Sequence, residues 1–573
     1  MKLLTLTLIF AVTMLCCRVR AADESALPFK LVYISQNFMF EKNVNDVIKI
    51  LERAAKAGYT GVALTDCKFH RWYETVTVKR PEYDNNVKRV RQACRDLKLA
   101  CYVFAGDMGT DTMSVDPNLA EGSPVVDAPF VVKGGKLVPA DTLALKNPSF
   151  EESTKPNTPA GWNADDPGTV AFLDETEKTE GKQSLRLEPG PGKNAHGNAR
   201  LMQTVAVSPF RYYHVSVQVK TSDFEHVGSF YISAGGSQEL IHQHFDIQPT
   251  QDWKTYDVVF NTLESKEVTL RIGSWGGRKG KIWIDNVKVE PGGFVNLIRR
   301  EGCELKLTSP DGKTVYEEGK DVPEIKDPKM GNTDWPGLWK YWYEGPSVAI
   351  PQGSRLKEGD TVLASYNHAQ MCYGYGVIGC MSNPKLMEVV QKNVREIQKV
   401  LQPDGYILPH DEIRHQGWCG CCVKSGKTPA KVLAENIAEH IAFIKKIDAG
   451  KPIFLWNDMV EPYHNAGKKD AHYYLVKGKD PWYNSWEGLD KDVIILNWHN
   501  FPENRLEAMK FFAERGHKQI LCGFYDASSD DMIPWLKEAA QVKGIVGVMY
   551  TTWGNNFSEL EKYLKVVETG TKK

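Results

Sequence analysis

The chain has 573 residues, of which 42% are hydrophobic and 25% are charged, and its formal net charge is -1. These values are typical of a globular protein with an ample core and a length that exceeds one ordinary domain. Because the charges balance and no basic stripe is present, we expect no nucleic acid among its partners.

The N-terminus has the pattern of a secretory signal peptide. One lysine precedes an apolar stretch from Leu3 to Cys17, and small residues end at Ala21, so we expect a signal peptide at 1–21. The apolar stretch is too short for a stop-transfer helix. A lipid anchor at Cys16 or Cys17 is less favoured, because the residues before them are bulky. We therefore expect an exported protein, secreted or periplasmic, with no membrane span.

Apolar runs alternate with helical periodicity at the two ends of the chain. Before residue 110, strands are expected at 29–35, 59–66 and 99–107, and helices at 44–57 and 83–97. After residue 372, strands are expected at 404–412, 451–458, 492–500, 518–526 and 544–556, and helices at 429–447, 503–515, 533–541 and 559–567. A further helix should begin at Pro384, with Ser382 or Asn383 as its cap. Three strands followed by five predict a (β/α)8 barrel built from residues 28–110 and 372–573, with its active site at the carboxyl ends of the strands.

Between these two parts the helical periodicity vanishes, and short alternating strands are separated by Gly, Pro, Asn and Asp turns. We expect a β-rich linker at residues 111–144, an antiparallel jelly-roll sandwich at 145–293 and a β-rich extension at 294–371. A ninth strand-like run at 361–368 is assigned to this insertion, because no helix separates it from the strand at 99–107 in the barrel order.

Two segments of the sandwich resemble carbohydrate-binding modules of families 4, 9 and 22. The resemblance opens with NPSFEE at 147–152 and closes with WIDNVKVE at 283–290. It implies that Glu151 and Asp285, which offer hard oxygen ligands, hold a structural calcium ion.

The tryptophans of this module have two possible roles. Trp162, Trp253 and Trp283 alternate with polar residues and are expected in the sandwich core. Trp275 lies between a serine and a glycine and is the better candidate for an exposed face that stacks on a sugar.

The stretch YILPHDEIRH at 406–415 contains two adjacent carboxylates, Asp411 and Glu412, directly after a run of apolar residues that is expected to be buried. Because side chains alternate along a strand, two neighbours can serve one site only where the strand ends and the backbone curls. An adjacent acid pair in another context usually indicates a solvated loop. Here the apolar run before the pair favours a site at the end of the fourth barrel strand.

The other strand ends carry the same mixture of aromatic, acidic and amide side chains. Such a mixture suits a sugar ring, whose apolar face is stacked and whose hydroxyls are hydrogen-bonded. The residues expected to bind substrate are Asp66, His410, Arg414, Trp456, Trp498, His499, Trp553 and Asn555, with Asp458, Tyr525 and Asp526 as further catalytic candidates.

The residues at five strand ends resemble those of family 20 β-N-acetylhexosaminidases. They are Asp-Glu after strand four, Trp and Asp at strand five, Trp near strand six, Tyr-Asp at strand seven and Trp-Gly at strand eight. The resemblance implies that Glu412 is the general acid and that Asp411 orients a 2-acetamido group. It also implies that Tyr525 donates to the acetamido oxygen and that Trp498 and Trp553 wall the pocket. The chain departs from the family's His-x-Gly-x-Asp-Glu motif, since it has YILPHDE instead.

The acidic residues at the strand ends are compatible with more than one mechanism. A retaining glycosidase needs an acid and a carboxylate nucleophile about 5 Å apart, yet no glutamate stands at the seventh strand end. Asp526 could be this nucleophile; otherwise substrate assistance, or inversion with Asp458 or Asp526 as base, fits. We expect a secreted glycoside hydrolase that needs no catalytic cofactor. The rival hypothesis is a carbohydrate-binding protein whose barrel is not catalytic.

Two further motifs carry chemistry. GYGVIG at 374–379 fits a dinucleotide motif, but the next helix begins only at Pro384, so the pyrophosphate cradle is absent. WCGCC at 418–422 could bind zinc, but it lacks a second Cys or His pair at finger spacing. Disulfides from this segment to Cys372 or Cys380 are favoured instead and would brace the loop after the acids.

Overall fold

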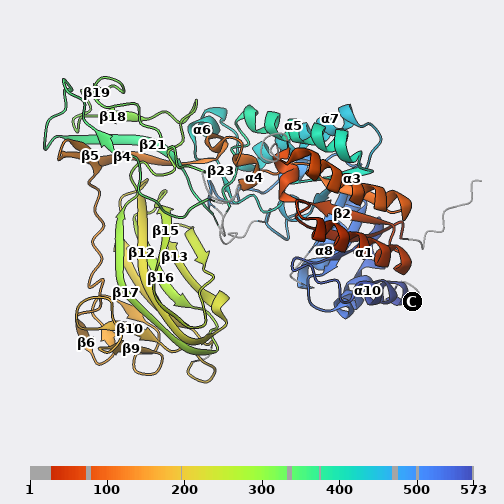
Figure 1. Ribbon diagram of the computed structural model, residues 1–573, viewed down its shortest axis with the longest axis horizontal. Coiled ribbons are helices and arrows are strands. Elements are labelled where there is room, and N and C mark those ends of the chain that lie inside the picture. Colours follow the sequence, from red (N-terminus) through yellow and green to blue (C-terminus); the bar gives the residue numbers. More distant parts are fainter. Residues whose placement is uncertain are drawn as a thin grey trace, which may run out of the picture.

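The computed structural model describes residues 27–72, 79–194, 196–331, 339–372, 376–467, 475–498 and 502–570. The expected signal peptide lies outside these residues. The two ends of the chain form one barrel, at the right of Figure 1, and the residues between them form β-sheets at the left.

Eight parallel strands form a closed barrel, and these are the eight strands that the sequence predicts. Their order is β1 (Phe29–Ser35), β2 (Gly61–Thr65), β3 (Ala100–Phe104), β22 (Gly405–Leu408), β24 (Ile453–Trp456), β26 (Ile494–Asn497), β27 (Gln519–Phe524) and β28 (Ile545–Thr551). The sheet closes where Lys30 pairs with Val548, and Tyr102 pairs with Gly405 across the insertion.

Helices cover the outside of the barrel, close to the predicted ranges. They are α1 (Glu41–Ala57), α3 (Arg80–Asp96), α5 (Pro384–Leu401), α7 (Pro429–Ile447), α8 (Arg505–Glu514), α9 (Met532–Ala539) and α10 (Leu560–Gly570), with short helices α4 (Thr110–Met113) and α6 (Gly420–Ser425). Asn383 caps α5, because its side chain accepts the N–H of Lys385 at 3.2 Å. Between β24 and β26 the described residues form 3₁₀ turns and the short strand β25 (Leu475–Val476), and none of them is in an α-helix.

Side chains fill the interior of the barrel. Alternate residues of the strands point inward, such as Leu31 and Tyr33 of β1 and Tyr102 and Phe104 of β3, and they form one buried cluster. A second, larger cluster lies between the strands and the helices. The barrel is therefore packed throughout, and only its rim is left to hold a ligand.

Two five-stranded antiparallel sheets form a sandwich at the lower left of Figure 1. One has the order β15 (Gln251–Asn261), β12 (Tyr212–Glu225), β17 (Lys279–Pro291), β10 (Ser184–Leu187) and β9 (Ala171–Asp174). The other has the order β14 (Glu239–His244), β13 (Phe230–Gly235), β16 (Glu267–Ser274), β11 (Ala199–Ala206) and β8 (Asn163–Ala164). Their facing apolar side chains make a further core, to which Cys372, Trp418 and Leu475 from outside the sandwich also contribute.

A third sheet joins the segments on both sides of the sandwich. Its order is β19 (Val315–Tyr316), β18 (Lys306–Thr308), β21 (Thr361–Ala369), β4 (Gly122–Lys133), β5 (Lys136–Pro139) and β20 (Val348–Ala349). The presence of β21 here confirms that the run at 361–368 belongs to the insertion. The expected linker and extension are thus one sheet, which lies above the sandwich in Figure 1.

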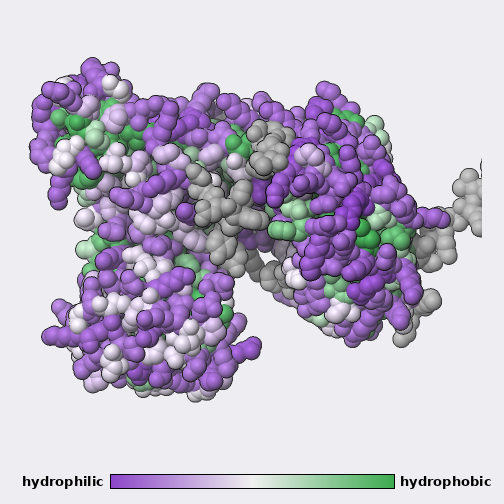
Figure 2. Space-filling model, in the orientation of Figure 1, coloured by the Kyte–Doolittle hydropathy of each residue, from purple (hydrophilic) through white to green (hydrophobic). Residues whose placement is uncertain are grey.

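The surface seen in Figure 2 is predominantly hydrophilic, and apolar residues appear on it only in small patches. Within the described ranges, the search for a helix both long enough and apolar enough to cross a bilayer found none.

We expect the fragment 145–293 to fold alone, because its two sheets enclose their own core. A fragment that ends at residue 278 should not fold, because it lacks β17, which lies between β12 and β10 in its sheet. Circular dichroism and thermal melting of the two fragments test this. Equal, cooperative melting of both would contradict the role given to β17.

Candidate active site at the mouth of the barrel

Four aromatic side chains meet where the strands end. The ring centroids of Tyr33 and Trp553 are 5.3 Å apart, and those of Tyr33 and Phe104 are 5.9 Å apart. Trp456 continues the group, 6.2 Å from Trp553 and 6.5 Å from Phe104. Trp553 is 55% exposed, whereas the other three are buried beneath it. This aromatic platform gives the mouth of the barrel an apolar floor suited to a sugar ring.

The acid pair follows β22, where the backbone curls as expected. Glu412 adopts a left-handed conformation, with φ of 45°, and both residues of the pair are exposed. Its N–H donates to the Asp458 carboxylate at 2.9 Å, and its own carboxylate forms an ion pair with Arg414 at 2.8 Å. A left-handed non-glycine residue is strained, and such residues concentrate at functional sites.

Asp458 connects the acid pair to the next strand. It follows β24, is fully buried, and accepts the Asn465 side-chain amide at 2.9 Å in addition to the Glu412 N–H. Asp411, Glu412 and Asp458 therefore lie together at the ends of two neighbouring strands, close enough for the charges of the last two to act on Asp411.

Two of these carboxyls hold protons more tightly than usual. Desolvation raises the pKa of Asp411 to about 8, and the nearby charges of Asp458 and Glu412 add to the shift. Asp411 is exposed when the whole residue is considered, whereas its carboxyl group is closely surrounded by protein, and this is what desolvates it. Burial also raises the pKa of Asp458 to about 6, although the hydrogen bond from the Glu412 N–H acts in the opposite direction.

Tyr525 and Asp526 have other partners in this structure. The Tyr525 hydroxyl donates to the carbonyl of Cys522, in the strand β27 that ends just before Tyr525. Asp526 accepts the Thr552 hydroxyl and the N–H groups of Trp553 and Gly554. Burial alone would raise the pKa of Asp526, but these donors outweigh it and the net shift is downward. Asp526 therefore fixes the loop that carries Trp553, and both side chains already have hydrogen-bond partners within the protein.

Asp66 and His410 also point into the protein. Asp66 is 2% exposed and accepts the Phe38 N–H, the Tyr83 hydroxyl and both nitrogens of Lys68. His410 is buried, and its Nε2 lies 2.9 Å from the Asn436 side-chain oxygen. Burial lowers the pKa of His410 to about 4, so the ring is neutral at physiological pH. The substrate-binding roles expected for Asp66 and His410 do not fit these positions.

The remaining candidates lie around the mouth. Trp498 is half-buried, with its ring centroid 4.7 Å from that of His464. Asn555 is exposed beside Trp553. His499 lies outside the described residues. Tyr33 and Phe104 were not among the candidates, although each is an aromatic residue near the end of a barrel strand, which is the signal that would have found them.

In the sandwich, Trp275 is 58% exposed, as expected for a stacking residue, and the Arg200 guanidinium lies 4.7 Å from its ring. Trp162 and Trp283 are buried in agreement with the sequence, whereas Trp253 is only half-buried.

The carboxylates expected to hold calcium already have hydrogen-bond donors. Asp285 accepts the N–H and hydroxyl of Thr179 at 2.7 and 2.8 Å, and Glu151 accepts the N–H of Lys182 at 2.8 and 2.9 Å. These donors use oxygen lone pairs that a calcium ion would need. The residues as placed do not fit a calcium site.

Comparison with known proteins supports the sandwich assignment. A family model described as a carbohydrate binding domain matches residues 143–278, which confirms the resemblance to such modules. A solved structure described as "CBM4 structure and function" is 17% identical, with 26% of this chain and 99% of that chain covered and a TM-score of 0.21. The CBM22-1 xylan-binding domain from Paenibacillus barcinonensis is 16% identical, with coverages of 26% and 97% and a TM-score of 0.20.

A rhamnosidase from Novosphingobium sp. PP1Y matches along 96% of this chain and 59% of its own, at 11% identity and a TM-score of 0.38. Among curated proteins, none matches the sequence. The resemblance of the barrel to family 20 stays a prediction.

We expect Asp66→Asn to lower the free energy of unfolding by about 3 kcal/mol, because it weakens four buried hydrogen bonds, one of them to an ammonium group. Urea denaturation measures the change. Asp411→Asn is the matched control and should leave stability unchanged or raise it, because it removes a carboxylate that its neighbours disfavour. Equal stability of Asp66→Asn and the wild type would show that Asp66 has no structural role.

Proposed function

We propose that this protein is a carbohydrate-active enzyme that hydrolyses glycosidic bonds at the mouth of the barrel. The observation that carries the proposal is the group of Asp411, Glu412 and Asp458 beside the aromatic platform, with the pKa of two of the three raised. Glycoside hydrolysis needs one carboxyl that keeps its proton and one that is ionised, next to a surface that holds the sugar. The match of residues 143–278 to a carbohydrate binding domain supports a carbohydrate as partner.

Asp411 is the proton donor in this proposal. Sequence reasoning favoured Glu412 as the acid and Asp411 as the orienting residue. However, a general acid has to be protonated at the working pH, and the pKa of about 8 supports Asp411 in that role. Glu412 is held by Arg414 and would stabilise positive charge that develops on the sugar. Asp458 is then the carboxylate that acts as base or nucleophile.

Substrate assistance by a 2-acetamido group is a second mechanism for the same site, through the resemblance to family 20. It requires a donor for the acetamido oxygen, and the Tyr525 hydroxyl donates to Cys522 instead. A thiazoline mimic of the cyclised intermediate would inhibit only under this mechanism.

The alternative function is carbohydrate binding without catalysis. The three hydrogen bonds that the Asp526 carboxylate accepts favour this alternative, because they leave no free acid at the end of the seventh strand to act as nucleophile or base. Turnover separates the two functions: a screen of aryl glycosides and polysaccharides that finds binding without cleavage supports the alternative. In either case we propose that the protein is exported, because of its N-terminal sequence and its carbohydrate-binding domain.

Substitution of the two acids distinguishes their roles. The variant of the general acid should lose on the order of a hundredfold or more in rate on substrates with poor leaving groups. The loss should be much smaller on an activated aryl glycoside, which departs with little protonation. We expect this dependence for Asp411→Asn. Glu412→Gln should instead slow both kinds of substrate about equally.

The reverse pattern would assign the acid to Glu412 and leave the site in place. Undiminished turnover of an unactivated substrate by both variants would reject the site itself.

The pH profile of kcat/KM should be bell-shaped, with limbs near pH 6 and pH 8. Asp458 has to be ionised, so the rate falls as the pH drops below about 6. Asp411 has to be protonated, so the rate falls as the pH rises above about 8. Asp411→Asn should remove the alkaline limb from the residual activity. A profile flat from pH 5 to 9 would contradict both assignments.

A further inference from the structure

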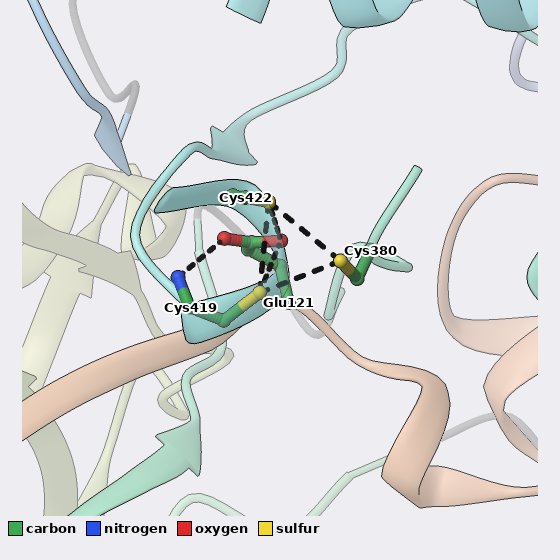
Figure 3. Close-up of side chains that lie close together, drawn as sticks. All are labelled: Glu121, Cys380, Cys419 and Cys422. Atoms are coloured by element: carbon green, nitrogen blue, oxygen red, sulfur yellow. Dashed lines mark hydrogen bonds between the residues drawn. The ribbon is translucent and has the colours of Figure 1, made fainter. Parts of the chain in front are cut away.

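Three cysteines and one glutamate converge behind the loop that carries the acid pair. Glu121, Cys380, Cys419 and Cys422 are all buried, and each offers one ligand atom within 4.8 Å of the others. Figure 3 shows the three sulfurs and the carboxylate facing one another. The Sγ of Cys380 lies 3.5 Å from that of Cys419 and 3.7 Å from that of Cys422, and the last two are 3.5 Å apart.

These distances match the edges of a coordination tetrahedron. With zinc–sulfur bonds of about 2.3 Å, two thiolates on one zinc ion lie about 3.8 Å apart. A disulfide would instead join two sulfurs at about 2.05 Å, which is much shorter than any of these separations. The Oε2 of Glu121 completes the set, at 3.2 Å from the Cys422 sulfur and 3.6 Å from the Cys419 sulfur.

We propose that Glu121, Cys380, Cys419 and Cys422 bind a structural zinc ion. Four protein ligands and no open position are typical of a structural rather than a catalytic site. Cys419 and Cys422 are placed by α6, which begins directly after Cys419. Cys421 lies between them in sequence. Its sulfur contacts Arg300 and the carbonyl of Glu301, and it also interacts with Cys303, Cys380 and Cys419.

The carboxylate of Glu121 is held in the orientation that a ligand needs. Its Oε1 accepts the N–H groups of Trp418 at 2.9 Å and Cys419 at 3.0 Å. This leaves Oε2 directed at the sulfurs. Ligating carboxylates in metal sites are characteristically fixed by such hydrogen bonds from outside the coordination shell.

Groups around the sulfurs suit thiolates. The side-chain amide of Gln416 donates to Cys422 at 3.0 Å, and the Arg300 guanidinium donates to Cys419 at 3.5 Å. Three thiolates and a carboxylate exceed the charge of one zinc ion by two, and the arginine offsets part of that excess. A cavity of about 870 Å³ lies beside the site and is lined by Gly420 and Cys421, the sequence neighbours of two ligands.

Sequence reasoning set zinc aside for want of a second pair of ligands near WCGCC. The structure supplies the other two ligands from distant segments, at Glu121 and Cys380. The expected disulfides are not formed, since all ten cysteines of the described residues are free thiols. Cys372 packs into the core of the sandwich and takes no part in the cluster.

The zinc ion would join three parts of the chain. Glu121 lies where the insertion leaves the barrel, Cys380 lies where it returns, and the other two ligands follow the acid pair along the chain. The site is therefore independent of whether the barrel is catalytic, and it fixes the loop after Glu412 to the base of the insertion.

Metal analysis of the full chain, purified without chelators, tests the proposal. We expect one zinc ion per chain, released when the thiols are blocked. Cobalt substitution should give the thiolate charge-transfer and d–d bands of a tetrahedral site. Cys380→Ser and Glu121→Gln should lose the metal, whereas Cys522→Ala, a buried cysteine of the barrel interior, should retain it. Gln416→Ala should weaken zinc binding by about 10- to 100-fold.

Two results would overturn the proposal. One is peptide mapping under non-reducing conditions that finds Cys380, Cys419 or Cys422 in a disulfide of the folded protein. The other is a wild-type chain that takes up no zinc, or takes up iron with sulfide instead, after reduction and reconstitution. Both are measured on the wild type, so they decide the question even where a ligand variant does not fold.

Discussion

The long insertion has to leave the barrel and return to it without opening the sheet. β3 and β22 are paired neighbours, although residues 105–404 lie between them. The outgoing and returning chains meet at an antiparallel contact, where the Glu121 N–H donates to Ile378 at 2.7 Å and the Cys380 N–H donates to Leu119 at 2.8 Å. The entropy of closing a loop grows only slowly with its length, so a short, well-packed contact can hold a very long insertion. The segments at this edge of the barrel mouth are therefore held in place by the contact between the outgoing and returning chains.

The acid pair depends on contacts that its own segment cannot make. A left-handed residue other than glycine costs on the order of 1 kcal/mol, and the turn at Glu412 is held by Asp458 and Arg414, one of them from the next strand. The same arrangement brings carboxylates together and raises the pKa of Asp411 and Asp458. The barrel around them thus compensates for both the backbone strain and the charge repulsion, which local sequence preferences alone would disfavour.

The sequence predicted the barrel well, because its strands and helices are local patterns. Pro384 after Asn383 located the start of α5, and the strand ends located the mouth. The sequence did not predict which residues contact one another across the fold. The sequence around Gly122 does not indicate that this residue pairs with Ala369 in the third sheet. The sequence also does not indicate that Asp66 accepts the Phe38 N–H or that the Tyr525 hydroxyl donates to the carbonyl of Cys522. The same holds for the cysteine cluster, whose ligands are separated by up to about 300 residues of chain.

The sandwich is joined to the acid loop by more than its chain connections. Trp418, six residues after Glu412, belongs to the buried core of the sandwich, and its indole N–H donates to Leu475 at 2.9 Å. The same residue's backbone N–H donates to Glu121 of the cysteine cluster. A module on a flexible linker only raises the local concentration of its ligand, whereas a module packed on the loop also fixes the direction from which a bound chain approaches. The carbohydrate-binding domain, the crossing of the insertion and the loop after the acid pair are therefore joined by direct contacts of Trp418.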